Sequence, residues 1–310
     1  MEYRHLGNSD LEVSVVGIGC WAMGGTAWGP VDDAECIGAI HRALDLGINF
    51  VDTAAEYGLG HSEEVVGQAV AGRRDEVVLA TKGGLNWTES GDVFRDSSRE
   101  HIVKGTEASL RRLNTDVIDL LQIHWPDENV PFEETMAAML ELQQQGKIRA
   151  IGLSNFTVEQ MQRCLAAGPV ESLQPPYSML RRDIERDILP FCRQHNIGVV
   201  VYGPLARGLL TGKYSREPTF TDNDVRHSDG NFRGERFQRN LAMLERLKAI
   251  AYPRGKTLAQ LAIRWCLSHP AVTVAIVGAK RAAQVEENVG GAGWRLSEEE
   301  LQKIDRILAT

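Results

Sequence analysis

The sequence has few of the patterns that mark disulfide-bonded, metal-binding or membrane proteins. Its five cysteines are widely spaced and form no C-x-x-C pair, which is typical of reduced, buried thiols in a cytosolic protein. The eight histidines show neither H-x-x-x-H nor H-E-x-x-H spacing, so we expect no metal site. No apolar run approaches the length of a membrane span, and the start, MEYRHLGNSD, has no apolar signal segment. We therefore expect a cytoplasmic protein.

Basic residues are fewer than acidic ones, 34 against 42. The formal net charge is -8, so we expect neither nucleic acid nor an anionic membrane as a partner. The composition is that of a globular protein, with 43% hydrophobic and 25% charged residues in a chain of 310. No linker rich in proline, glycine or serine divides the chain. We expect one domain over residues 1–310.

Short apolar runs alternate with amphipathic stretches along the whole chain. In the first stretch, Asp32 and Glu35 have capping-box spacing, residues 36–44 place their apolar members on one helical face, and Gly47 ends the helix. Eight such strand–helix units require a largely parallel sheet and predict a closed (β/α)8 TIM barrel. Residues 3–14 predict a β-hairpin ahead of it, and residues 256–269 and 297–308 predict two additional helices.

A doubly wound dinucleotide-binding fold is the alternative α/β architecture. Residues 17–22, GIGCWA, satisfy the loose pattern G-x-G-x-x-G/A. That fingerprint has to open a helix directly, whereas MGGTAWGP follows here. These glycines are therefore predicted to belong to the first barrel strand and its loop.

Polar groups follow the apolar runs at the points where the predicted barrel strands end. In such barrels the C-terminal strand ends and the loops after them form the active face. Tyr57, in the second loop, is expected to join them on one rim. The strand-end residues are Asp52, Lys82, His124, Ser154, Asn155, Gln174, Tyr202 and Gly278.

Four of these residues make chemical sense together. In one interpretation each residue has only a local role, in which Asp52 hydrogen-bonds its own turn and Tyr57 covers a hydrophobic edge. As a set, Lys82 would lower the pKa of the Tyr57 phenol, and Asp52 would keep the lysine charged in a pocket of low polarity. His124 would hydrogen-bond the substrate oxygen. A tuned phenol beside an imidazole suits protonation of a carbonyl oxygen while a hydride reaches its carbon.

The chain resembles the aldo-keto reductase superfamily over essentially its whole length, and most of all the shorter-loop bacterial branches and the potassium-channel β-subunit type. The stretches that carry the resemblance are DTAAEYG, VVLATKGG, IDLLQIHWPD, GKIRAIGLSNF, QPPYSML, VYGPLARGLLTGKY and VGAKRAAQVEEN. The resemblance implies a (β/α)8 barrel that binds an extended nicotinamide cofactor, and reduction of carbonyl compounds by NADPH. It also implies a catalytic tetrad of Asp52, Tyr57, Lys82 and His124, with Tyr57 as proton donor.

The resemblance further implies a cofactor site along the rim. Ser154, Asn155 and Gln174 would hold the nicotinamide carboxamide, although Ser154 and Asn155 also suit capping the next helix. Tyr202 would stack on the nicotinamide ring, and Trp21 would stand beside it or beside the substrate. The pyrophosphate would lie against Gly203, Pro204, Leu205 and Gly208, with Lys213 either adding a charge there or pointing into solvent.

The adenosine end would meet the segment after the last strand. Gln284, Glu287 and Asn288 match family positions there, although the last two also suit a solvated helix surface. Ala279 and Gln284 replace a serine and an arginine that often occur in the motif. Lys280 and Arg281 begin the helix and offer cations to a 2'-phosphate, with no acid beside them in sequence to accept a 2'-hydroxyl. We therefore expect NADPH to be preferred over NADH.

Substrate contacts are expected from the loops. Trp87 and Trp125 are candidate pocket walls beside Trp21, Tyr57 and His124, although both also suit packing. Three functions are compatible with the pattern: an NADPH-dependent reductase of aldehydes and ketones, or an alcohol or sugar dehydrogenase in reverse; a cofactor-sensing regulatory subunit with slow turnover; and a barrel enzyme of sugar-phosphate chemistry without nicotinamide. We expect the first, with a small carbonyl or alcohol as substrate, because no long N-terminal extension for partner contact is present.

Overall fold

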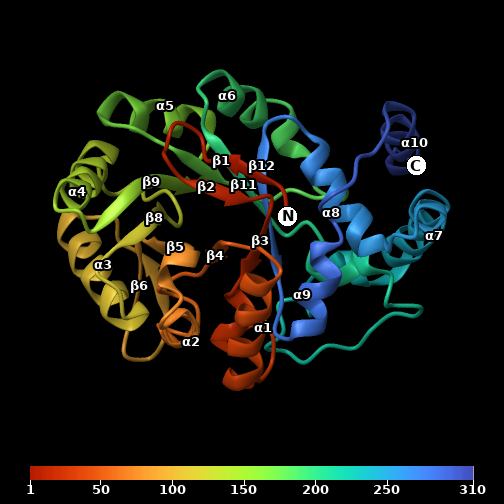
Figure 1. Cartoon of the computed structure of the whole chain (residues 1–310), viewed down its shortest axis with the longest axis horizontal. Helices are drawn as coiled ribbons and strands as arrows, with labels where there is room; N and C mark the ends of the chain where they lie inside the picture. The colour runs from red at the N-terminus through yellow and green to blue at the C-terminus, as the bar shows by residue number, and fades with distance from the viewer. Residues whose placement is uncertain (310) are drawn as a thin grey trace.

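Eight parallel strands form a closed barrel in the computed structural model, which describes residues 1–309 (Figure 1). The strands follow one another around the barrel in chain order, with β10 joined to β9 and β11. The prediction of a (β/α)8 barrel is therefore confirmed. The strands are β3 (Val16–Gly19), β4 (Phe50–Asp52), β5 (Val78–Gly83), β8 (Ile118–Ile123), β9 (Ile148–Ser154), β10 (Ser172–Gln174), β11 (Gly198–Tyr202) and β12 (Val272–Gly278).

Helices surround the barrel on the outside (Figure 1). The α-helices are α1 (Asp33–Asp45), α2 (His61–Val70), α3 (Arg99–Leu113), α4 (Phe132–Gln144), α5 (Val158–Ala167), α6 (Ile188–Gln194), α7 (Gly234–Ala251), α8 (Leu258–Ser268), α9 (Ala282–Val289) and α10 (Glu298–Leu308). Short 3-10 turns are η1 (Trp21–Gly24), η2 (Arg74–Glu76), η3 (Asp183–Glu185), η4 (Ala206–Thr211), η5 (Gly230–Phe232) and η6 (Tyr252–Arg254). As predicted, Asp32 caps α1, its side chain accepting from the N–H groups of Ala34 and Glu35.

The helix predicted at residues 256–269 is present as α8, but its place differs from the expectation that it is additional to the eight strand–helix units. In the structure α8 lies on β12 and beside α9, and most of its residues are buried, whereas α7 packs outside it against α8 and α10. The composition explains why α8 lies inside and α7 outside. The sequence of α8, LAQLAIRWCLS, is almost continuously apolar, whereas α7 carries charges on its exposed side. The helix α10 is additional, as predicted.

The N-terminal hairpin closes one end of the barrel. Its strands are β1 (Tyr3–His5) and β2 (Glu12–Ser14), which pair antiparallel as predicted. Leu6, Leu11 and Val13 from this hairpin are buried in one hydrophobic cluster with the inward-facing residues of the barrel strands. A second hairpin, β6 (Leu85–Trp87) and β7 (Val93–Arg95), lies in the third loop and was not predicted.

Strand alternation explains why the barrel interior changes from apolar to polar along its length. Successive residues of a strand face opposite sides, so every second residue points inward. Phe50 and Ala80 belong to the apolar cluster inside the barrel. Asp52 and Lys82 stand two positions further along the same strands and therefore also face inward, above the apolar layer. The C-terminal end of the barrel thus holds the polar groups.

No helix within residues 1–309 is both long enough and apolar enough to cross a membrane.

The loops after β3 and β4 touch through backbone at Gly24 and Gly58. Gly58 has a φ of +63°, and a Cβ placed on it would lie 2.2 Å from the carbonyl oxygen of Gly24. Gly72 also has a positive φ, of +76°, but open space around it. The close approach fixes the loop that carries Tyr57.

We expect Gly58→Ala to lower the free energy of unfolding far more than Gly72→Ala. Both changes carry the left-handed backbone cost of about 1–2 kcal/mol. Gly58→Ala adds the cost of overpacking, about 1–3 kcal/mol. Urea unfolding of the two variants measures the difference. Equal losses would show that the two loops separate freely.

Candidate active site

A buried ion pair lies at the C-terminal end of the barrel. The ammonium of Lys82 donates to Asp52 Oδ2 at 2.7 Å, to the carbonyl oxygen of Thr53 at 2.9 Å and to the Tyr57 hydroxyl at 3.3 Å. Lysine has three N–H donors, and all three are used. Lys82 is 1% exposed and Asp52 is 3% exposed. The structure therefore brings together three of the four predicted tetrad residues in one hydrogen-bonded chain.

Two amides complete the surroundings of Asp52. Gln174 donates to Asp52 Oδ1 at 2.8 Å and to Gln122 Oε1 at 3.1 Å. Gln122 donates to the same carboxylate oxygen at 3.3 Å. A buried carboxylate needs such donors as well as its cation. Gln122 was not predicted, although it stands two residues before His124 and so faces inward on the same strand.

The Tyr57 side chain is half-buried, and its pKa is raised well above the ordinary value of 10. Burial is the largest cause, and the carboxylates of Asp52 and Glu56 add to it. The expected lowering by Lys82 is not observed. The reason is geometric: Asp52 lies closer to the ammonium than the phenol does, so the two charges largely cancel at the hydroxyl and desolvation decides. Tyr57 therefore holds its proton at neutral pH.

His124 joins the tetrad across the ring of Tyr57. The two ring centroids are 5.7 Å apart at an interplanar angle of 78°. Burial, followed by the charge of Lys82, lowers the pKa of His124 well below 6.5, so the imidazole is neutral near pH 7. Its Nδ1 is buried without a hydrogen-bond partner among residues 1–309. A neutral imidazole beside a protonated phenol suits hydrogen bonding to an oxygen that enters the site.

The rim residues at the ends of β9 and β11 form a second set of hydrogen bonds. Tyr202 donates from its hydroxyl to Asn155 Oδ1 at 2.9 Å, and Asn155 donates to the carbonyl oxygen of His124 at 3.1 Å. Ser154 donates to the carbonyl oxygen of Gln174 at 2.9 Å. The alternative role for Ser154 and Asn155 as helix caps is excluded, because Thr157 caps α5 in a full capping box.

The loop after β11 offers an open backbone surface. Gly203 has a φ of +70° and no atom within 4 Å of the position of a Cβ, so its face is free to meet a ligand. Pro204 is buried and Leu205 is half-buried. Lys213 is exposed and lies 3.5 Å from the position that a Cβ would take on Gly208. The predicted pyrophosphate residues thus share one stretch of the rim.

The segment after β12 contains a contact that the sequence did not reveal. Arg281 bonds Glu35 of α1 at 3.0 Å, an acid far away in sequence. The Lys280 ammonium donates to the carbonyl oxygen of Trp28 at 3.3 Å. Both cations lie at the start of α9, which Gly278 precedes at the end of β12. The expectation of no acid beside these cations is therefore wrong.

The other predicted residues of this segment have separate positions. Gln284 is exposed and accepts from the Lys280 backbone N–H at 2.8 Å. Glu287 is half-buried and accepts from the Thr257 hydroxyl at 2.5 Å, whereas Asn288 is buried. The reading of Glu287 and Asn288 as a solvated helix surface is excluded by these positions.

Aromatic residues wall the space beside Tyr57. Trp21 lies with its ring 6.1 Å from that of Tyr57 and 5.3 Å from that of Trp28, which was not predicted. Trp87 is half-buried in β6. Trp125 is 37% exposed under the guanidinium of Arg95. Trp21 and Trp28 extend the site from the tetrad toward the start of α9, because the carbonyl oxygen of Trp28 accepts from Lys280.

No group of three or more histidine, cysteine, aspartate or glutamate side chains within residues 1–309 is arranged to hold a metal ion.

A (β/α)8 barrel whose C-terminal rim holds a phenol, an ammonium, a carboxylate and an imidazole has the architecture of a barrel enzyme. The chain belongs to the Aldo/keto reductase family, whose profile matches residues 15–309. It is similar to aldo-keto reductase YhdN of Bacillus subtilis (strain 168), with 45% identity over 99% of this chain and 94% of that protein. It is 37% identical to the NADH-specific methylglyoxal reductase of Escherichia coli (strain K12), over 94% of each protein.

Two solved structures share the fold and much of the sequence. The glycerol dehydrogenase AKR11B4 from Gluconobacter oxydans matches with a TM-score of 0.93 and 44% identity, covering 99% of this chain and 95% of that one. An aldo/keto reductase from Klebsiella pneumoniae, in complex with NADP and acetate, matches with a TM-score of 0.76 and 33% identity, covering 96% and 92%. The resemblance drawn from the sequence is confirmed.

Burial of His124 predicts a pH-dependent stability. In the unfolded chain the imidazole takes up a proton near pH 6.5, whereas in the folded protein it stays neutral. The free energy of unfolding should therefore fall as the pH decreases below about 6.5, by up to about 1.4 kcal/mol per pH unit for this group. His124→Gln should remove that part of the slope. Burial lowers the pKa of His269 as well, so its contribution remains in the variant.

The measurement is urea unfolding of both proteins between pH 5 and 7.5. Parallel pH profiles would show that His124 titrates alike in the folded and unfolded chains.

Proposed function

We propose that the protein catalyses reversible, NADP-dependent reduction of aldehydes or ketones, with Tyr57 as the general acid. The observation that carries the proposal is the position of the protonated Tyr57 hydroxyl, 3.3 Å from the Lys82 ammonium and beside a neutral His124. Relatives support it, since one is described as a methylglyoxal reductase and another as a glycerol dehydrogenase. A small carbonyl compound, or an alcohol in reverse, is the proposed substrate.

The four side chains have different roles, which follow from their charges. His124 donates a hydrogen bond to the carbonyl oxygen and polarises it. Tyr57 gives its proton to that oxygen as the carbon becomes an alcohol, which leaves a phenolate. Lys82 stabilises the phenolate across 3.3 Å, and Asp52 holds the lysine in place. In the oxidation direction the Tyr57 phenolate acts as the base, and Lys82 stabilises it before it takes the proton.

The rim suits an extended nicotinamide dinucleotide, which supplies the hydride when bound. We propose that Ser154, Asn155 and Gln174 hold the carboxamide. The side-chain oxygen of Gln174 accepts no hydrogen bond within residues 1–309, while its nitrogen donates to Asp52 and Gln122. Tyr202 would cover the ring. The open face at Gly203 would admit the pyrophosphate, with Lys213 as a nearby charge.

The cofactor preference rests on the start of α9. A 2'-phosphate is a dianion that needs cations or several hydrogen bonds. Lys280 and Arg281 supply two cations, but Arg281 is paired with Glu35. That pair is exposed, with 70% of the arginine and 51% of the glutamate side chain accessible, so its breaking costs little. We propose that NADPH is preferred over NADH, as the NADP complex of the Klebsiella protein supports and the NADH-specific E. coli relative opposes.

Two further proposals concern the chain as a whole. Residues 1–310 act as one domain, which is supported by a continuous hydrophobic core from Val15 to Ile307. The protein works in the cytoplasm, which is supported by five buried, unpaired cysteines.

Tyr57→Phe tests the chemistry. The change removes the proton donor and little else, so aldehyde-dependent NADPH oxidation should fall by about 10²-fold or more. NADPH affinity, measured by fluorescence titration, should stay nearly unchanged. Tyr252→Phe, which removes a hydroxyl from an exposed ring, is the control and should retain full activity. Near-normal turnover of Tyr57→Phe would exclude the donor role.

Two variants at α9 test the cofactor preference. Replacing Lys280 and Arg281 together by Ala should weaken NADPH binding by about 1–3 kcal/mol and hardly change NADH binding. Glu35→Gln releases Arg281 and should strengthen NADPH binding by up to about 1 kcal/mol. Replacing Lys303 and Arg306, exposed on α10, by Ala controls for net charge. The proposal fails if the double variant loses NADPH and NADH affinity equally.

A further inference from the structure

A cavity lies at the opposite end of the barrel from the tetrad. It has a volume of about 490 Å³ and is lined by the N-terminal hairpin, the turn between α6 and β11, the C-terminal half of α8 and the segment before α10. Gly198 and Val272, which begin β11 and β12, are among its walls, whereas Tyr202 and Gly278 end the same strands at the active rim. The cavity is therefore separate from the proposed catalytic site.

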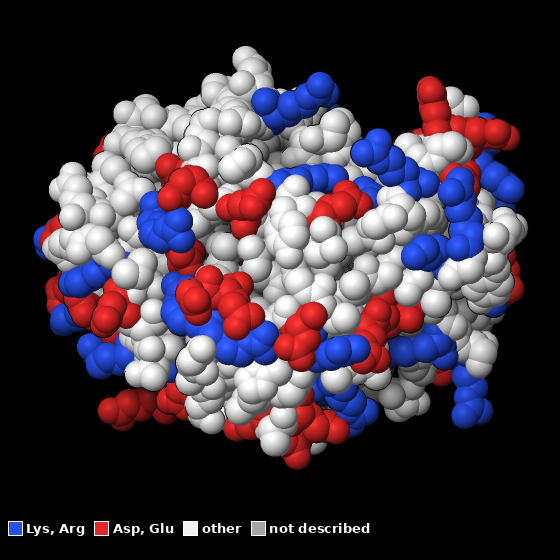
Figure 2. Space-filling model, in the orientation of Figure 1, with Lys and Arg blue, Asp and Glu red and all other residues white. Residues whose placement is uncertain are grey.

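The lining of this cavity is strongly basic. Four arginines, Arg4, Arg193, Arg264 and Arg295, face a single acid, Glu2. This excess is local, because the whole chain has a net charge of -8. Figure 1 views the barrel from the end that the hairpin covers, and in the same view Figure 2 shows basic and acidic side chains close together above the centre. Like charges in one cavity repel one another unless an anion lies among them.

Arg264 is the buried member of the group. Only 4% of it is exposed, and its Nε is buried without a hydrogen-bond partner within residues 1–309. Its Nη1 donates to the carbonyl oxygen of Trp294 at 2.8 Å and to Glu2 Oε1 at 3.4 Å. That glutamate oxygen also accepts from the Gly293 N–H at 2.9 Å. A long, shared contact compensates a buried guanidinium poorly.

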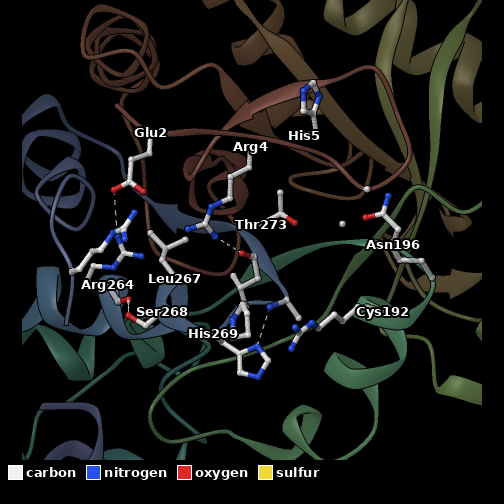
Figure 3. Close-up of a pocket in the computed structure, with 18 of the residues that line it drawn as sticks. Glu2, Arg4, His5, Cys192, Asn196, Arg264, Leu267, Ser268, His269 and Thr273 are labelled. Carbon is white, nitrogen blue, oxygen red and sulfur yellow. Dashed lines mark hydrogen bonds and ion pairs between the residues drawn. The ribbon is translucent and has the colours of Figure 1, made fainter. Parts of the chain in front are cut away.

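The other three arginines have no carboxylate partner within the described chain. Arg4 is half-buried and donates only to the carbonyl oxygen of Val272, at 2.5 Å. Arg193 and Arg295 are exposed, and their side chains make no hydrogen bond or ion pair within residues 1–309. Figure 3 shows the side chains of Arg4 and Arg264 side by side in the cavity, below Glu2. Burial lowers the pKa of both Arg4 and Arg264, Arg295 adds to that lowering, and Glu2 opposes it only in part. A bound anion would stabilise both charged guanidinium groups.

We propose that this cavity binds a small phosphate-class dianion, either free phosphate or a phosphate monoester. Guanidinium groups present paired N–H donors that match phosphate oxygens, and several of them around one anion share its charge. The volume exceeds that of one phosphate ion, which leaves room for an organic group attached to it. The site stands apart from any nucleotide at the rim and does not rest on the proposed function.

Isothermal titration calorimetry tests the proposal on the full-length protein with NADP⁺ in excess, so that the rim is filled. The probes are inorganic phosphate, phenyl phosphate and phenol, none of which is a carbonyl compound or an oxidisable alcohol. Phosphate and phenyl phosphate should bind, and phenol should not. Comparable affinities for the two anions would identify the free ion as sufficient, whereas much tighter binding of phenyl phosphate would identify a monoester. No binding of either anion, or equal binding of phenol, would overturn the proposal.

Variants place the binding in this cavity. Replacing Arg193 and Arg295 together by Ala should raise the Kd for phosphate about tenfold or more, and these exposed changes leave the fold intact. Arg4→Gln should raise it as well. Replacing Arg111 on α3 and Arg236 on α7 by Ala removes two exposed arginines outside the cavity and should leave the Kd unchanged. An unchanged Kd in both cavity variants would overturn the proposal, even if the rim binds no nucleotide.

Discussion

The buried ion pair between Lys82 and Asp52 is the interaction on which the site depends. Removing two charges from water is costly, and the attraction between them repays this only when their remaining donors and acceptors are also satisfied. Here the lysine has its three acceptors and the carboxylate has its two amide donors. Because these partners come from β4, β5, β8 and β10 and the loop after β4, the pair fixes half of the rim at once.

The same pair decides the state of the tyrosine. An isolated ammonium at 3.3 Å would draw the proton off a phenol, but this ammonium is already matched by a nearer carboxylate. Burial then controls the pKa of Tyr57 and keeps the hydroxyl protonated. A proton donor for carbonyl reduction is thereby available at neutral pH, and the lysine charge becomes useful only when the phenolate forms. Neutral His124 adds a hydrogen bond without adding a competing charge.

All the barrel strands alternate in the same way, and the residues at their inward positions change from apolar to polar along the barrel. Apolar inward positions fill the middle, the hairpin closes the N-terminal end, and charged or amide residues occupy the last inward position at the other end. Both ends therefore hold buried polar groups. At the C-terminal end the protein supplies every partner of Lys82, but within residues 1–309 it leaves His124 Nδ1 without a hydrogen-bond partner, as it leaves Arg264 Nε at the N-terminal end.

The sequence by itself determined the barrel, its N-terminal hairpin and the polar residues at the strand ends, because strand alternation, helix caps and turns are local signals. It did not determine which partners those residues meet. Gln122, Trp28 and Glu35 enter the site from segments far apart in the chain, and the order of α7 and α8 depends on packing. The direction of the Tyr57 pKa likewise depends on burial and on which of two groups lies nearer to one ammonium. Only the closed tertiary structure decides such distances.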